Sequence, residues 1–290
     1  MEKLIEIEKH INSKDNRYIF YSVYPFTTEN IDGYLDYFDL DHTSLLTVGS
    51  SCDQAINASF MGCEDITIYD LSPLVKYYYY LKIASLLSLD REDFLRFLCK
   101  SKCDGRIKLN VSLFSKVYFE KVKQTLKRLD YESYYIWDYL FSNYTSAEIA
   151  NLFRRDITNE DSIIYCNRYL KNNKNYNQAK RVIENSIVNF IEGNVTDMKL
   201  GRKFKNIWLS NVIDYLDESD IDIMFENAID LLLDDGKVLL SYFYYDLSNE
   251  DAIRRNPSLR KVSYTKESFN GINKSDFNNS VYIYTKKPRN

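Results

Sequence analysis

The chain has 290 residues and a formal net charge of −4, from 38 basic and 42 acidic side chains. This length is enough to bury a core in one large domain or two small ones, and 45% hydrophobic with 28% charged residues is typical of a globular protein rather than a disordered or fibrous one. A slightly negative net charge creates no overall positive potential that would attract a polyanion, so we expect no nucleic acid partner.

The sequence has no run of about 18 apolar residues, and its first ten residues, MEKLIEIEKH, are charged where a signal peptide has an apolar core. We therefore expect a cytoplasmic protein without a transmembrane segment. The five cysteines include no C-x-x-C pair and the only histidines are His10 and His42, so we expect no metal site.

Two strands and a short helix are predicted near the start of the chain. Residues 44–49, SLLTVG, form an apolar, β-branched run that suits a buried parallel strand. Residues 53–60 have the apolar spacing of a helix that stops at Gly62. Residues 65–69 then suit a second strand, which ends at Asp70.

A longer helix is predicted over residues 74–87, because Ser72 can cap its free N–H groups and proline is favourable at a first helical position. The order strand, glycine turn, helix, strand, acidic residue, helix is typical of a doubly wound α/β sheet that binds nucleotides. Residues from 90 to about 180 are predicted to be helical, as an insertion between the second and third strands.

The second half of the chain returns to strands. A helical stripe of apolar residues at 221–232 precedes a turn at Asp235 and Gly236. The further strands expected are 186–191, 206–210, 237–244 and a closing edge strand at 281–285.

Two features of the first strands suggest a ligand. Gly49, Ser50 and Ser51 lie between a strand end and a helix, where backbone N–H groups can hold an anion, although an ordinary tight turn is the alternative. Asp70 lies 21 residues beyond Gly49, where doubly wound proteins place a carboxylate that accepts hydrogen bonds from ribose hydroxyls. A cap on the next helix is its alternative role.

Five segments resemble, in order and spacing, the motifs of class I S-adenosylmethionine-dependent methyltransferases. They are LLTVGSS at 45–51, ITIYD at 66–70, IEGNVTDM at 191–198, NIWLSNVIDYL at 206–216 and LLLDDGKVLLS at 231–241. The resemblance implies a Rossmann-like sheet that binds S-adenosylmethionine above its strand ends. The residues that it implies for cofactor binding are Gly49, Ser50, Ser51, Asp70, Gly193, Asn194, Asn211 and Val212.

Within that superfamily, residues 69–97 resemble the S-adenosylmethionine:diacylglycerol 3-amino-3-carboxypropyltransferases of betaine-lipid synthesis. This resemblance implies that a 3-amino-3-carboxypropyl group, rather than a methyl group, can be the one transferred, to a lipid or a small molecule. Asp214 and Tyr215 follow the fourth strand and can deprotonate or orient an acceptor hydroxyl, or cap the next helix.

We therefore expect three parts: an N-terminal helical or lid segment at 1–43, a cofactor-binding α/β core at 44–89 and 186–290, and a helical insertion at 90–185 that caps the cleft and supplies the acceptor site. Methyl transfer to a small-molecule acceptor is the leading hypothesis. A catalytically inactive nucleotide-binding or scaffold protein is the third, because the glycine-rich turn is reduced to GSSCD.

Overall fold

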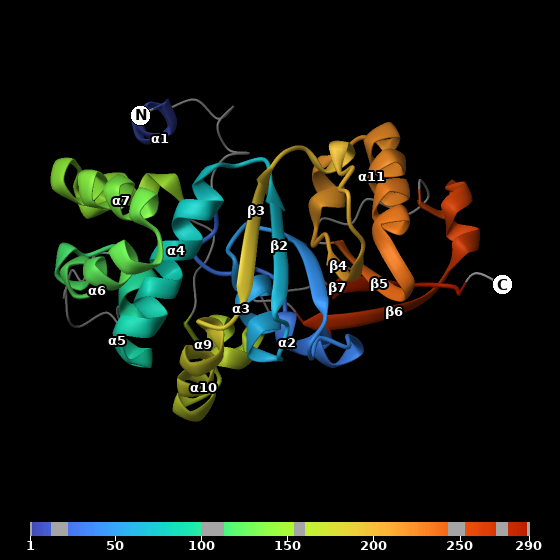
Figure 1. The fold of residues 1–290 in the computed structure, drawn as a ribbon, viewed down its shortest axis with the longest axis horizontal. Coiled ribbons are helices and arrows are strands. Elements are labelled where there is room, and N and C mark those ends of the chain that lie inside the picture. The colour runs from blue at the N-terminus through green and yellow to red at the C-terminus, as the bar shows by residue number, and fades with distance from the viewer. Residues whose placement is uncertain are drawn as a thin grey trace.

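The computed structural model describes residues 2–12, 23–99, 113–153, 160–242, 253–270 and 278–288. Its centre is a seven-stranded sheet with the order β3-β2-β1-β4-β5-β7-β6 (Figure 1). The strands are β1 (Ser44–Val48), β2 (Asp65–Asp70), β3 (Ile187–Glu192), β4 (Phe204–Trp208), β5 (Leu232–Tyr242), β6 (Val262–Asn270) and β7 (Asn278–Lys286). The predicted doubly wound α/β class is confirmed.

The first five strands are parallel, while β7 runs antiparallel to β5 and β6 antiparallel to β7. The chain moves outward from β1 to β2 and β3 and then crosses back to β4 on the other side of β1. The sheet therefore has its topological switch point between β1 and β4, where doubly wound folds bind ligands beyond the carboxyl ends of the strands.

Both faces of the sheet are buried at its central strands. Successive side chains of a strand point to opposite faces, so Leu45 packs into the core beneath the N-terminal half of the chain while Leu46 packs into the core beneath α11. The first face is covered by α2 (Ile31–Tyr34), α3 (Asp53–Phe60) and α4 (Leu74–Ser88), and the second by α11 (Glu218–Leu231).

The insertion between β2 and β3 is helical wherever the structure describes it. Helices α6 and α7 pack on α4, and α10 packs on α3, which places the insertion at the end of the molecule away from the C-terminus (Figure 1). Its helices are α5 (Arg91–Leu98), α6 (Lys116–Leu129), α7 (Tyr131–Asn143), α8 (Ser146–Ile149), α9 (Glu160–Cys166) and α10 (Asn173–Ile183).

Short 3-10 helices connect these elements. They are η2 (Leu35–Tyr37), η3 (Ala150–Leu152), η4 (Arg168–Leu170), η5 (Val195–Asp197), η6 (Val212–Tyr215) and η7 (Pro257–Lys261).

The C-terminal prediction needs two corrections. The turn expected at Asp235 and Gly236 lies inside β5, where Asp235 has a φ of 57° and the pairing with β4 shifts register. The run at 281–285 belongs to β7, which is not an edge strand because β6 pairs outside it. Residues 243 and 244 of the predicted strand lie outside the described residues.

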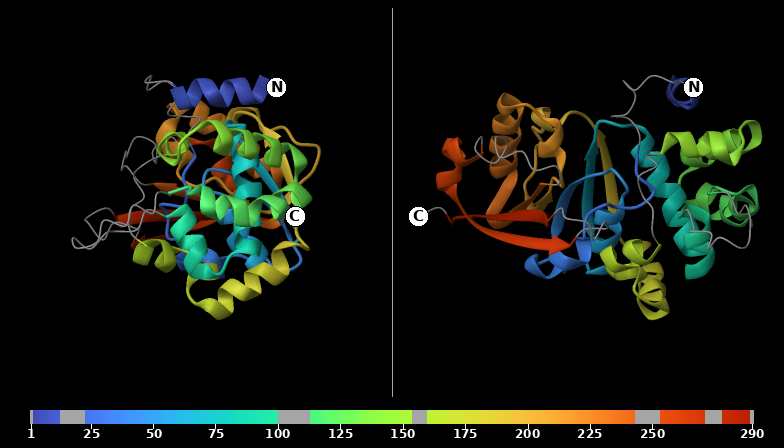
Figure 2. Two further views of the ribbon diagram at one scale, coloured as in Figure 1. Left: turned by 90° about the vertical axis from the view of Figure 1, so that its left-hand side faces the viewer. Right: turned by 180° about the vertical axis from the view of Figure 1, so that it is seen from behind.

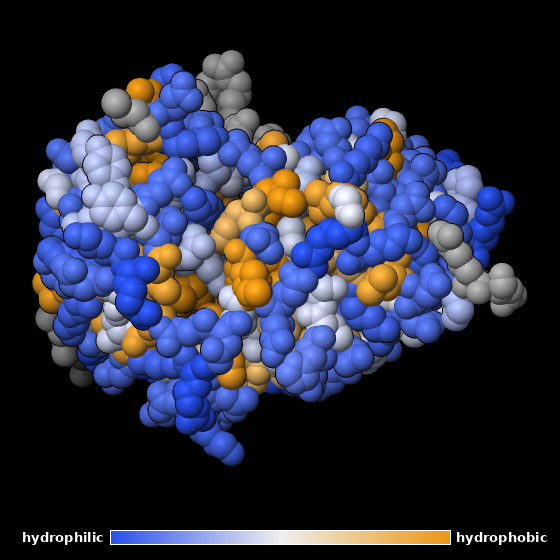
Figure 3. Space-filling model, viewed as in Figure 1, coloured by the Kyte–Doolittle hydropathy of each residue, from blue (hydrophilic) through white to orange (hydrophobic). Residues whose placement is uncertain are grey.

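The sequence analysis did not predict β6, because apolar and polar side chains do not alternate clearly along it. Val262 is buried while the next residues through Lys266 are exposed, so the strand lacks the apolar face by which buried strands are recognised. At the opposite edge, β3 exposes Ile187, and Figure 3 shows hydrophobic side chains over this part of the face.

An N-terminal helix, α1 (Glu2–Asn12), lies across the end of the molecule where the parallel strands finish (Figures 1 and 2). Lys3 forms an ion pair of 2.7 Å with Glu192 at the end of β3. On the other side, the Glu8 carboxylate accepts hydrogen bonds from the hydroxyls of Tyr139 and Tyr144 at 2.9 and 2.8 Å. The helix therefore bridges the sheet and the insertion.

Candidate functional site

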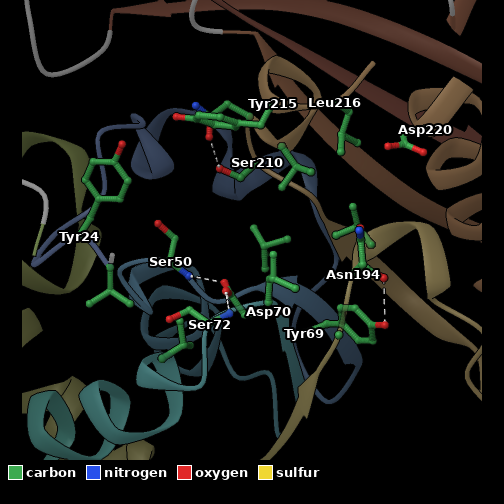
Figure 4. Close-up of a pocket in the computed structure, with 18 residues that line it drawn as sticks. Tyr24, Ser50, Tyr69, Asp70, Ser72, Asn194, Ser210, Tyr215, Leu216 and Asp220 are labelled. Atoms are coloured by element: carbon green, nitrogen blue, oxygen red, sulfur yellow. Dashed lines mark hydrogen bonds between the residues drawn. The ribbon is translucent and has the colours of Figure 1, made fainter. Parts of the chain in front are cut away.

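A cavity of about 340 Å³ lies at the carboxyl ends of β1 to β4, at the switch point of the sheet (Figure 4). The segment before α2 and the start of α11 complete its wall, through Val23, Tyr24 and Asp220. The cavity is lined by seven of the predicted site residues: Ser50, Asp70, Gly193, Asn194, Asn211, Val212 and Tyr215.

The other predicted residues lie behind this lining. Gly49 and Ser51 belong to the turn that presents Ser50, and Asp214 lies in η6 beside Tyr215. We expected the insertion to cover the site, but none of its described residues lines the cavity, because α6, α7 and α10 pack on the helices that cover one face of the sheet.

The turn after β1 is tight and strained. Cys52 donates its N–H to the carbonyl of Gly49 at 2.6 Å, and Ser50 and Cys52 have φ values of 41° and 65°. Such backbone conformations cost about 1 to 3 kcal/mol for residues other than glycine and cluster at functional sites. In a glycine-rich turn, glycines adopt positive φ angles of this kind. In this turn, Ser50 and Cys52 adopt them.

Gly49 is required for space. A Cβ at this position would lie 2.2 Å from Val75 Cγ1 and 2.9 Å from Ile68 Cγ2, so the turn approaches α4 and β2 too closely for any side chain. The glycine lets the N–H groups of residues 49 and 50 reach Asp70.

We expect Gly49→Ala to lower the free energy of unfolding by about 1 to 3 kcal/mol, because the added methyl overpacks the contact between β1 and α4. Urea unfolding measures this. Gly201→Ala is the matched control, since nothing lies within 4 Å of a Cβ at that position. Equal stability of the two variants would contradict the assignment of a packing role to Gly49.

Asp70 joins two loops at the floor of the cavity. Its Oδ2 accepts the N–H groups of Gly49 and Ser50 at 3.0 Å each, and its Oδ1 accepts the N–H of Ser72 at 2.8 Å. Burial raises the pKa of this carboxyl, while hydrogen bonds from the backbone of Ser50, Ser72, Gly49 and Leu71 act in the opposite direction. The carboxylate is thus fixed where it meets the cavity.

The N-cap of α4 is not the residue that the sequence predicts. The structure places Pro73 at the N-cap, where proline makes no side-chain hydrogen bond to the helix. Proline was expected one position later, inside the first turn. Asp70 holds the chain entering the helix instead, through the N–H of Ser72.

Beside Asp70, Tyr69 and Gly193 form the next part of the wall. The Tyr69 hydroxyl donates to the carbonyl of Asn194 at 3.0 Å, and a Cβ on Gly193 would lie 2.4 Å from that hydroxyl. The side-chain carbonyl of Asn194 accepts the N–H of Thr196 at 3.2 Å, so Asn194 caps η5 as well as lining the cavity.

Sequence analysis missed Glu29, a buried carboxyl behind the end of β4. Its side chain accepts hydrogen bonds from the hydroxyls of Tyr34, at 3.1 Å, and Ser210, and from the backbone N–H of Asn211. Ser210 and Asn211 line the cavity, and Ser210 has a φ of 56°. Glu29 therefore holds the strained corner after β4 against the N-terminal segment.

Burial raises the pKa of Glu29 to about 7, from an ordinary value of 4.5, and the charge of Asp214 adds to this rise. The hydrogen bonds from Ser210, Tyr34 and Asn211 oppose it. Glu29 is 1% exposed, so solvent contributes little to stabilising its charge.

Because the folded protein binds this proton more tightly than the unfolded chain, the stability contributed by Glu29 is complete below about pH 4.5 and is lost as the pH rises through 7. We expect Glu29→Gln, which stays neutral, to gain up to about 3 kcal/mol relative to the parent protein between pH 5 and pH 8. Urea unfolding at both pH values measures the difference. A difference independent of pH would contradict an ionising Glu29.

A second buried network anchors the same N-terminal segment. Lys82 on α4 pairs with Asp53 at 2.7 Å with neither side chain exposed, and its ammonium also donates to the carbonyls of Pro25 and Ser51. Asp53 accepts the Tyr169 hydroxyl at 2.8 Å as well. Burial lowers the pKa of Lys82, opposed by the charge of Asp53. Lys82 thus links the turn after β1 to residues 23–30.

The described residues contain no cluster of three His, Cys, Asp or Glu side chains that could hold a metal ion. Among the described helices, none is both long and apolar enough to cross a bilayer.

No family model and no curated protein matches the sequence. Among solved structures, the chain is similar to the N-methyltransferase NodS from Bradyrhizobium japonicum in complex with S-adenosyl-L-homocysteine, at 9% identity over 99% of this chain and 100% of that chain, with a TM-score of 0.42. It is similar to the magnesium protoporphyrin IX methyltransferase ChlM from Synechocystis with bound SAM, at 9% identity over 99% and 98% of the two chains, also with a TM-score of 0.42.

A third similar structure is a TehB-like SAM-dependent methyltransferase from Corynebacterium glutamicum, at 10% identity over 90% of this chain and 89% of that chain, with a TM-score of 0.42.

Proposed function

We propose that the chain binds S-adenosylmethionine in the cavity above β1 to β4 and transfers its methyl group to a small-molecule acceptor. The observation that supports this most directly is a carboxylate, Asp70, at the end of β2, hydrogen-bonded to the turn after β1 and lining a cavity at the switch point of a doubly wound sheet. A dinucleotide-binding protein would need a second nucleotide site and a G-x-G-x-x-G turn, which the sequence lacks.

The polar and apolar residues that line the cavity suit the polar and apolar parts of S-adenosylmethionine. Asp70 is placed to accept hydrogen bonds from the ribose hydroxyls, in exchange for one of its backbone partners. Leu71 and Val195 offer apolar surface to the adenine ring, and Asn194 offers an amide beside it. Ser50, on the strained turn, would contact the amino-acid end of the donor.

When bound, S-adenosylmethionine supplies a methyl group already activated by its positive sulfonium. The chain then has to bind the acceptor in line with that methyl group, and holding two reactants together in the right geometry supplies much of the rate. This accounts for a described lining without a histidine, lysine or cysteine side chain. Tyr215 lines the cavity and is placed to orient an acceptor, with Asp214 next to it in η6.

Two measurements test the proposal. Calorimetric titration should show that S-adenosylmethionine and S-adenosylhomocysteine both bind, and mass spectrometry of reaction mixtures should identify S-adenosylhomocysteine as the product. Methylthioadenosine would instead identify transfer of the 3-amino-3-carboxypropyl group, which the sequence resemblance to the betaine-lipid enzymes motivates. Failure of both nucleotides to bind would contradict the proposal and favour a scaffold role.

A further inference from the structure

A buried carboxyl lies one hydrogen bond behind the cavity wall. Glu29 is 1% exposed and accepts hydrogen bonds from the hydroxyl of Ser210 and the N–H of Asn211, both of which line the cavity. The carbonyl of Ser210 accepts the N–H of Ser241 at 2.8 Å, so β5 holds the backbone of this corner in place. The charge of Glu29 therefore acts on the cavity surface through groups of fixed position.

The titratable groups around Glu29 lie on three elements. Asp214 in η6 disfavours a second negative charge, and the charge of Glu29 in turn contributes to the raised pKa of the Cys166 thiol on α9. The Tyr34 hydroxyl on α2 donates to the carboxylate and favours it. Burial outweighs the hydrogen bonds, and a pKa of about 7 means that the protonated and ionised forms of Glu29 are both populated near neutral pH. A positive charge in the cavity would favour the ionised form.

The proposed function brings such a charge into the cavity. S-adenosylmethionine carries a positive sulfonium, whereas S-adenosylhomocysteine, which remains after methyl transfer, carries a neutral thioether in its place. Figure 4 shows Ser210 and Tyr215 on the side of the cavity opposite Asp70. With the ribose at Asp70 and the acceptor beside Tyr215, the methyl group and its sulfur have to lie between them, toward Ser210.

From this geometry, and resting on the proposed function, we propose that Glu29 is a specificity-determining residue, which releases its proton when S-adenosylmethionine binds and thereby favours the charged donor over the neutral product. The ionised carboxylate attracts the sulfonium through the wall formed by Ser210 and Asn211. S-adenosylhomocysteine has no such charge, so it binds without the proton release and without this attraction.

Ser210 offers a path for the proton. Its hydroxyl donates to Glu29 and also lies 3.4 Å from the side-chain carbonyl of Asn211 at the cavity surface. A protonated Glu29 can donate to the Ser210 oxygen, whose own hydrogen then turns to Asn211. One proton passes to solvent when the donor binds. After methyl transfer the sulfur is neutral, and the carboxylate takes one proton back from solvent, so Glu29 returns to its starting state over one turnover.

Calorimetric titration in two buffers counts the released protons. Pipes and Tris differ in their enthalpy of ionisation, so the binding enthalpies measured in each at pH 7 give the number of protons. Each ligand is titrated into the parent protein and into Glu29→Gln, which stays neutral, so that protons from the ligand's own amino group cancel. With S-adenosylmethionine we expect the parent to release about 0.4 to 0.5 proton more than Glu29→Gln, and with S-adenosylhomocysteine the same number as Glu29→Gln.

The affinities give a second measurement that a purely structural role of Glu29 would not change. Between pH 6 and pH 8, the preference for S-adenosylmethionine over S-adenosylhomocysteine should rise about fivefold more in the parent than in Glu29→Gln. Glu226→Gln is the matched control and should behave as the parent does, because Glu226 is an exposed glutamate on α11 outside the cavity lining.

A pair of smaller probes needs no variant. 5′-Deoxy-5′-(dimethylsulfonio)adenosine and 5′-methylthioadenosine differ by the sulfonium methyl group and lack the amino group, so protons released near pH 7 come from the protein. The parent should release a proton fraction with the first probe and none with the second. Equal release with both probes would overturn the assignment, as would equal release by the parent and Glu29→Gln with S-adenosylmethionine.

The two levels of the inference fail separately. If neither S-adenosylmethionine nor S-adenosylhomocysteine binds, the proposed function fails and the role of Glu29 fails with it. If both bind and the proton counts do not differ between them, the proposed function stands and the assignment of Glu29 alone fails.

Discussion

Replacing Lys82 by methionine is expected to lower the free energy of unfolding by about 3 to 5 kcal/mol. The Lys82 ammonium and the Asp53 carboxylate are fully buried and 2.7 Å apart, so the variant leaves a carboxylate in the core without its cation. Methionine has nearly the length of the lysine stem, which limits the contribution of a cavity to the loss. Equilibrium unfolding in urea gives the free energy.

Lys76→Met is the matched control on the same helix. Lys76 pairs with Glu132 at 2.6 Å, but both side chains are partly exposed, and pairs of that kind contribute about 1 kcal/mol or less. A second check is the double variant Lys82→Met with Asp53→Asn, which should recover part of the lost stability because no buried charge remains. Similar small losses in Lys82→Met and Lys76→Met would show that the buried pair is not ionised.

Asp70→Ala is expected to weaken the binding of S-adenosylmethionine by about 2 to 4 kcal/mol, or roughly thirty- to a thousandfold. The substitution removes the proposed acceptor for the ribose hydroxyls and also frees the N–H groups of Gly49, Ser50 and Ser72, which fix the two loops below the cavity. Calorimetric titration of the folded variant measures the dissociation constant.

Circular dichroism and urea unfolding must accompany this titration, so that loss of binding is not confused with loss of the fold. Asp234→Ala is the control, because Asp234 is an exposed aspartate that does not line the cavity. A folded Asp70→Ala protein with an unchanged dissociation constant would remove Asp70 from the binding site.

The first strands and their loops could be predicted because the interactions that form them are close in sequence. An apolar run ending at Gly49, a helix stopped by Gly62, and a strand ending at Asp70 each depend on patterns within a few residues. Helix α3 and strand β2 both end where the sequence predicts. The residues implied by the methyltransferase resemblance come together at the edge of the sheet where the parallel strands end.

The rest depends on contacts between distant residues. Glu29 meets Ser210 across 181 positions, and Tyr169 reaches Asp53 across 116, so nothing near either residue signals its role. Lys82 lies in the apolar helix α4 and is buried, but the sequence alone does not distinguish it from a surface lysine. Tyr24 lines the cavity from the segment before β1, and the sequence analysis gave it no role.

The wall formed by residues 23–30 also sets the order in which the protein can be completed during synthesis. Glu29 is made early, but its partner Ser210 follows 181 residues later, which at about 5 to 20 residues per second is roughly 10 to 40 seconds of translation. During this interval the Glu29 carboxyl and the apolar residues around it have no β4 to pack against. The cavity above β1 to β4 therefore forms after most of the chain has been synthesised, and a nascent chain stalled before β4 would expose this segment to chaperones.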